Sequence, residues 1–107
     1  MSPPSSTSLD LPQKYLEQVK AILRSHAPHA EVWAYGSRVT GDNHEASDLD
    51  LVLRNRPEGT TALYELKEAF SESNLPIGVD VMDWARIPLS FHREIEKAHV
   101  VVQTRRI

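Results

Sequence analysis

Residues 36–53 read GSRVTGDNHEASDLDLVL, and this stretch decides how the rest of the chain is interpreted. Asp48 and Asp50 stand two residues apart in it. In a strand, both carboxylates would project from one face, whereas Leu49 and Leu51 would project from the other. Neighbouring carboxylates repel each other, and a divalent cation with its preference for oxygen ligands would reverse that cost. The pair therefore indicates a metal site.

A third carboxylate, Asp80, lies in the apolar segment Val79–Met82 (VDVM). An unpaired acid among core-type neighbours is costly, which favours a functional reason for its presence. If this segment is a strand beside the first one, Asp48, Asp50 and Asp80 converge. Three carboxylates and phosphate oxygens can hold two divalent ions about 3.5–4 Å apart, one activating a hydroxyl and one neutralising a triphosphate. We therefore predict that these three aspartates are both metal ligands and catalytic residues.

The other end of the stretch has the features of a phosphate-binding turn. Gly36 and Ser37 follow an apolar segment and precede a short helical turn, where backbone N–H groups can approach a phosphate closely. The Ser37 hydroxyl can donate to a phosphate oxygen, and Arg38 can clamp phosphates or pair with a carboxylate. Ser47 can orient Asp48. We predict nucleotide binding by Gly36, Ser37, Arg38 and Ser47.

Taken together, these motifs resemble the signature of the DNA polymerase beta nucleotidyltransferase superfamily. The matching parts are Gly36-Ser37, a spacer of about ten residues, Asp48-Leu49-Asp50, and the later Asp80. The longer string GSR…G…SDLDL is similar to the minimal nucleotidyltransferase (MNT) subgroup, whose members are short stand-alone domains. The resemblance covers about Val32 to Asp83. Val39 and Thr40 depart from it, because small or charged residues often follow Gly-Ser-Arg there.

The resemblance implies a palm-like core and magnesium-dependent transfer of a nucleoside monophosphate, most commonly AMP from ATP, onto a protein or small-molecule hydroxyl. It implies two Mg²⁺ ions, with Mn²⁺ as an alternative, and ATP or another nucleoside triphosphate as the donor. It also implies a helical HEPN-type partner, because MNT domains often serve as antitoxins that transfer AMP to a tyrosine of a HEPN ribonuclease.

The rest of the chain alternates helical and strand patterns. The 3.6-residue and two-residue periodicities and the turn residues predict these elements: helices at Leu11–His26, Thr60–Ser73 and Ile87–Lys97, a helical turn at Arg38–Gly41, and strands at Glu31–Tyr35, Leu49–Leu53, Val79–Met82 and Val100–Gln103. Asp10 or Ser8 can cap the first helix. This order indicates a two-layer α+β (α/β) domain, which the resemblance makes a small mixed β-sheet with flanking helices. We expect a disordered tail at residues 1–9 and one nucleotidyltransferase domain at residues 10–107.

Composition excludes several classes of protein. The 107 residues include no cysteine, which removes disulfides and thiolate zinc sites. The net charge of −3 argues against a protein that grips a long nucleic-acid template, although a nucleotide can still bind. No apolar run is long enough to span a membrane, and no secretory signal is evident, so we expect a cytoplasmic location. A chain this small also favours a partner or a homo-oligomer.

Two alternatives stay open. In the first, the chain is a non-catalytic antitoxin that neutralises a helical partner by contact alone, through the face of Leu11–Leu23 or of Ile87–Lys97. In the second, the fold is unrelated and the acids are surface residues. Tyr35 is either a packing residue or a neighbour of the nucleotide. Asp83 is expected to cap a turn, Trp33 to lie in the core, and the five histidines to bind no metal.

Overall fold

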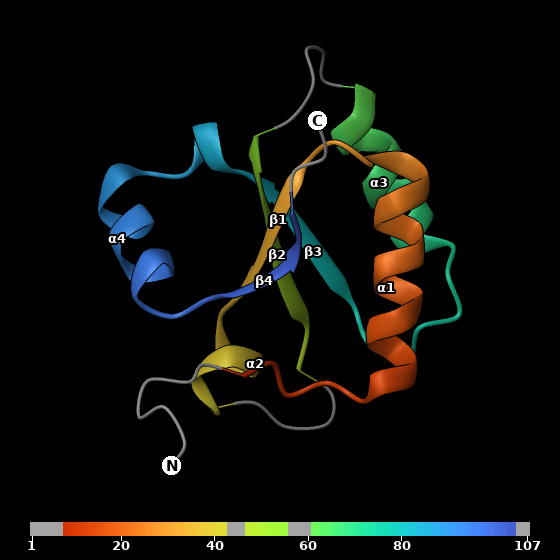
Figure 1. Cartoon of the computed structure of the whole chain (residues 1–107), viewed down its shortest axis with the longest axis horizontal. Coiled ribbons are helices and arrows are strands. Elements are labelled where there is room, and N and C mark those ends of the chain that lie inside the picture. The colour runs from red at the N-terminus through yellow and green to blue at the C-terminus, as the bar shows by residue number, and fades with distance from the viewer. Residues whose placement is uncertain (1–7, 43–46, 56–60, 105–107) are drawn as a thin grey trace.

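The computed structural model describes residues 8–42, 47–55 and 61–104 (Figure 1). In chain order, the elements are α1 (Gln13–His26), β1 (Glu31–Tyr35), α2 (Ser37–Thr40), β2 (Leu49–Asn55), α3 (Thr61–Ser71), β3 (Val79–Asp83), the 3-10 turn η1 (Trp84–Arg86), α4 (Leu89–Lys97) and β4 (Val100–Gln103). The α+β class predicted from the sequence is confirmed, and the predicted elements are present with ends that differ by a few residues.

The four strands form one mixed sheet in the order β3-β2-β1-β4. β1 is antiparallel to both β2 and β4, whereas β2 and β3 are parallel and are connected through α3. The parallel pairing places β3 directly beside β2, which is the arrangement required for the aspartates of the two strands to share a face.

The two faces of the sheet differ in what covers them. α1 and α3 lie on one side and α4 lies on the other, with α2 near the end of the sheet (Figure 1). Leu49, Leu51 and Leu53 are fully buried in the larger core under α1 and α3. Because side chains alternate along a strand, Asp48, Asp50 and Val52 project to the α4 side. The face predicted for the two aspartates is therefore confirmed.

Aromatic stacking connects α4 and η1 to the sheet. His99 stacks on Trp33 with ring centroids 3.6 Å apart, and His92 stacks on Trp84 at 3.9 Å. The Arg54 guanidinium lies over both indoles, 4.0 Å from the Trp33 centroid and 4.5 Å from that of Trp84. Cation–π contacts of this kind are favourable by about 0.5–2 kcal/mol each. Trp33 is buried, as expected, and the two histidines have a packing role that their spacing did not reveal.

The ends of the elements correct some details. Pro12 is the N-cap of α1, and no side chain within the described ranges caps that helix, so the prediction that Asp10 or Ser8 does so is wrong. Asp83 caps η1 as predicted, because its Oδ1 accepts a hydrogen bond from the Ala85 amide.

Two further segments differ from the expected boundaries. Leu9, which was placed in the disordered tail, packs against the larger core, and residues 1–7 lie outside the described ranges. β2 continues through Asn55, two residues beyond the predicted end of the strand at Leu53, and residues 56–60 also lie outside these ranges. None of the helices in the described residues is both long and apolar enough to cross a membrane.

Candidate active site

The centre of the site is a row of three side chains across neighbouring strands. Asp50 on β2 is the register partner of Tyr35 on β1 and of Asp80 on β3. Asp50 is half-buried, whereas Asp48 and Asp80 are exposed. The three aspartates therefore lie at adjacent positions on one accessible face, as the sequence predicted.

The electrostatics of this row follow from burial and from like charges. Burial raises the pKa of Asp50 to about 6, with smaller contributions from the negative charges of Asp80 and Asp48. Burial also raises the pKa of Tyr35 to about 12, aided by Asp50 and then Asp80. The face accumulates negative charge that a cation would relieve, and the Tyr35 hydroxyl keeps its proton at neutral pH.

Two glycines leave room for two of the carboxylates. A β-carbon at residue 36 would lie 2.4 Å from Oδ2 of Asp50, and one at residue 78 would lie 2.8 Å from Oδ1 of Asp48. Gly36 also has a φ of 86°, a backbone conformation that residues other than glycine rarely adopt. The Gly-Ser turn is thus in van der Waals contact with the Asp50 carboxylate. Sequence reasoning identified Gly36 but not Gly78.

The turn that follows Gly36 is a single helical turn. The Gly36 carbonyl accepts hydrogen bonds from the amides of Val39 and Thr40, both at 3.0 Å. Gly41 ends the turn in the left-handed region with a φ of 93°. Ser37 is the first residue of α2, is partly exposed and directly follows Gly36, so the predicted phosphate turn begins at the Asp50 carboxylate.

Arg38 has a structural role that its predicted function did not include. Its side chain is only 4% exposed, its Nε donates to the Ser47 carbonyl at 3.0 Å, and its Nη1 donates to the Asp10 carbonyl at 2.7 Å. Arg38 therefore connects the segment before α1 to the residue that precedes Asp48. Direct binding of nucleotide by Arg38 or Ser47 stays a prediction.

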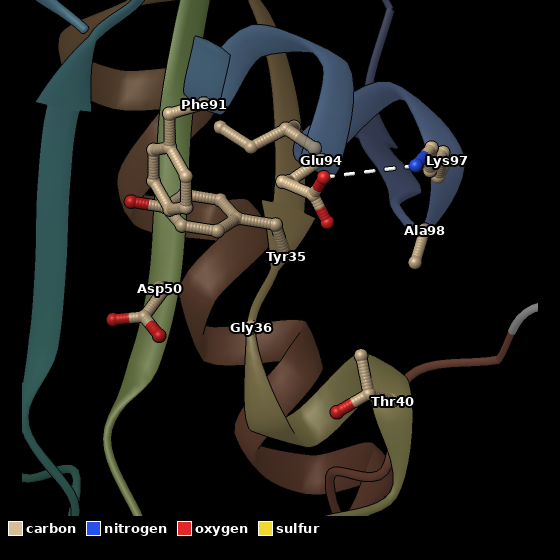
Figure 2. A pocket seen from close by; sticks show the side chains of 9 residues that line it. Tyr35, Gly36, Thr40, Asp50, Phe91, Glu94, Lys97 and Ala98 are labelled. Carbon is tan, nitrogen blue, oxygen red and sulfur yellow. Dashed lines mark ion pairs between the residues drawn. The ribbon is translucent and has the colours of Figure 1, made fainter. Parts of the chain in front are cut away.

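A pocket of about 330 Å³ opens beside Asp50, between α2 and α4 (Figure 2). It is lined by Tyr35, Gly36, Thr40, Asp50, Phe91, Glu94, Ile95, Lys97 and Ala98. Figure 2 shows the Phe91 ring beside the Tyr35 ring, with Asp50 below them on β2. Sequence patterns did not indicate that α4 contributes to the site, because this pocket depends on how α4 packs on the sheet.

The donor set fits a divalent cation by its chemistry. Three carboxylates on neighbouring strand positions are oxygen ligands of the kind that Mg²⁺ prefers. Burial is the larger cause of the raised pKa of Asp50, and repulsion by the other two carboxylates adds to it. As the side chains are placed, no three His, Cys, Asp or Glu groups in the described residues form a complete ligand cluster. His44 and its neighbours at residues 43–46 lie outside the described ranges.

A mixed sheet with flanking helices, an Asp-x-Asp strand, a third aspartate on the next strand and a Gly-Ser turn against the first pair together define a nucleotidyltransferase palm. The family model described as polymerase beta nucleotidyltransferase matches residues 17–106. The chain belongs to this family.

Known proteins support this assignment. The "Probable protein adenylyltransferase MntA" of Haemophilus influenzae is 45% identical over 100 residues, which are 92% of this chain and 88% of that protein. A crystal structure of a toxin–antitoxin with AMP-PNP superposes with a TM-score of 0.68 over 83% of this chain and 73% of that chain. At 20% identity, the second similarity concerns the fold alone.

Proposed function

We propose that this protein transfers AMP from ATP to a hydroxyl group of a partner protein, and that the transfer depends on magnesium. The observation that carries the proposal is the register pairing of Asp50 with Asp80 on an accessible face, with Gly36 against the Asp50 carboxylate. The 45% identity to a protein named as an adenylyltransferase supports the choice of AMP.

Asp48, Asp50 and Asp80 would hold the metal ions. Bound magnesium supplies charge neutralisation of the triphosphate and lowers the pKa of a bound hydroxyl. Within the chain, the glycine at residue 36 allows the backbone to come close to the phosphates, and the Ser37 hydroxyl donates to a phosphate oxygen. The accessibility of Asp80 leaves the far side of the site open to an acceptor hydroxyl.

We also propose that the acceptor is a tyrosine of a helical HEPN-type ribonuclease, so that AMP transfer neutralises a toxin. The fold shared with a chain of a toxin–antitoxin structure that contains AMP-PNP is consistent with this role.

The decisive experiment is transfer of label from ATP to the partner in the presence of magnesium. Asp50→Asn should reduce the rate by about 10²–10³-fold or more, since a group acting on the transition state is removed. Asp42→Asn is the matched control: Asp42 is also an acid near α2, but it is exposed and is bonded only to the Thr40 hydroxyl among the contacts described. It should retain transfer.

Neutralisation of the toxin by Asp50→Asn, without transfer, would instead identify the chain as an antitoxin that acts by contact. Equal rates for the wild type and Asp50→Asn would refute catalysis at this site.

A further inference from the structure

The pocket between α2 and α4 can be assigned to one part of the reacting complex, if the proposed function is correct. Gly36 of the phosphate turn and Asp50 line one side of the pocket, and the other side consists of α4. Its volume of about 330 Å³ lies at the lower end of the range typical of small-molecule sites, about 300–1,000 Å³. Either the nucleoside or the acceptor side chain could fill such a space.

The geometry of phosphoryl-type transfer separates these two occupants. In an in-line displacement the attacking oxygen enters opposite the leaving group. The leaving pyrophosphate belongs at the Gly36-Ser37 turn, at the end of β1. The acceptor must therefore enter from the opposite direction, across Asp50, where β3 is an edge strand and Asp80 is exposed. The pocket lies on the phosphate-turn side, so it belongs to the nucleotide.

The chemistry of the lining agrees with a flat apolar ring. The apolar part of the lining consists of Tyr35, Phe91, Ile95 and Ala98. The polar side chains that the two helices contribute to the lining are Thr40 from α2 and Glu94 and Lys97 from α4. The Phe91 and Tyr35 rings meet edge to face, with centroids 5.8 Å apart and an interplanar angle of 83°. Phe91 is 42% exposed, so part of its ring remains available to a ligand.

We propose that this pocket binds the base of the nucleoside triphosphate and that Phe91 contacts the base ring. Phe91 then determines affinity for the nucleoside part of the donor but not for its phosphates. The assignment gives α4 a direct role in substrate binding, and it makes the β3 edge the entrance for the acceptor.

Binding measurements with two ligands test the assignment without requiring transfer. In the presence of magnesium, the wild type should bind ATP more tightly than inorganic tripolyphosphate, which has the phosphates but no base. Phe91→Ala should weaken ATP binding by roughly 5- to 100-fold, the range expected for loss of one base–aromatic contact, and should leave tripolyphosphate binding unchanged. Phe91→Leu keeps apolar bulk without a flat ring, so its affinity for ATP should lie between those of the wild type and Phe91→Ala.

Leu89→Ala is the matched control. Leu89 lies on the same helix and is 79% exposed, but it does not line the pocket, so its replacement should leave binding of both ligands unchanged. Thermal unfolding of each variant establishes that it is folded.

Two outcomes overturn the assignment, and they differ from failure of the proposed function. Unchanged ATP affinity in Phe91→Ala would show that the base binds elsewhere. Unchanged ATP affinity with a raised KM for the acceptor protein would show that the pocket holds the acceptor. If the wild type binds neither ATP nor tripolyphosphate, the proposed function itself fails and the assignment fails with it.

Discussion

A β-carbon at residue 78 would lie 2.8 Å from Oδ1 of Asp48, so only glycine at that position leaves the Asp48 carboxylate where it stands. Gly78 precedes β3, and its carbonyl accepts a hydrogen bond from the Leu49 amide at 2.9 Å. The start of β3 thus fixes both the backbone and the side-chain space around Asp48.

Gly78→Ala should therefore alter metal dependence rather than folding. Because Gly78 is exposed and its φ is not positive, the free energy of unfolding should change by less than about 0.5 kcal/mol. The displaced Asp48 carboxylate should raise the magnesium concentration needed for half-maximal transfer by about tenfold, as when a group next to a metal ligand is disturbed. Asn74→Ala, an exposed change in the same loop, should alter neither quantity. An unchanged magnesium requirement in Gly78→Ala would remove Asp48 from the metal site.

The raised pKa of Asp50 makes the stability of the metal-free protein depend on pH. With a pKa of about 6 in the folded state and 3.8 as the ordinary value, the protonated carboxyl favours folding. The contribution of protonated Asp50 to the free energy of unfolding is complete below about pH 4 and is lost as the pH rises through about 6. The full shift would correspond to about 3 kcal/mol, but Asp50 is only half-buried, so about 1–2 kcal/mol is expected.

Denaturant unfolding in EDTA between pH 4 and pH 7 measures this effect. Other carboxyl groups titrate in the same range, so the relevant quantity is the difference in unfolding free energy between the wild type and Asp50→Asn. The free energy of unfolding of the wild type minus that of Asp50→Asn should fall as the pH rises. A constant difference would mean that Asp50 has an ordinary pKa.

The two causes of that pKa can be separated by Asp80→Asn. Burial is the larger cause and the charge of Asp80 is the next. The variant should therefore lower the pKa of Asp50 only in part, leaving it above 3.8. NMR titration of the Asp50 carboxyl without metal measures the change directly, and Asp83→Asn serves as a comparison, since Asp83 is a buried cap on the same strand. A rise in the pKa, or a fall to the ordinary value, would contradict this order of causes.

The sequence was sufficient for the parts of the site that depend on local periodicity. The alternation of side chains along one strand predicted that Asp48 and Asp50 share a face and that Leu49 lies on the opposite face. The burial of Leu49 in the larger core agrees with this prediction. The turn at Gly36 was also predicted from local sequence, and the structure adds that its φ is positive, a conformation that glycine tolerates.

Relationships between distant segments were not accessible in the same way. Periodicity along β2 and β3 does not show that the two strands are neighbours, so the pairing of Asp50 with Asp80 follows only from the parallel pairing of these strands in the structure. The role of Phe91 depends on the packing of α4, which rests on stacked pairs such as His99 with Trp33. Local patterns do not encode these long-range contacts.

Arg38 shows the same limitation, and it gives a prediction that separates structure from substrate binding. Its guanidinium donates to the carbonyls of Asp10 and Ser47, and the Asp10 amide donates back to the Arg38 carbonyl at 2.8 Å. Arg38→Met would leave two partly buried carbonyls without these donors, which should lower the free energy of unfolding by about 1–3 kcal/mol. Arg38→Lys should be destabilising too, because one ammonium lacks the forked geometry that reaches both carbonyls.

The measurement is denaturant unfolding together with ATP binding at a temperature at which both variants are folded. If Arg38 only positions the backbone, ATP affinity should fall modestly, in proportion to the disturbance before Asp48. Arg86→Met, an exposed arginine in η1, is the control and should change neither quantity. A large loss of ATP affinity in Arg38→Met with unchanged stability would assign the guanidinium to the phosphates after all. Because a buried arginine donating to two carbonyls is costly to remove, we expect the loss of stability to be the larger effect.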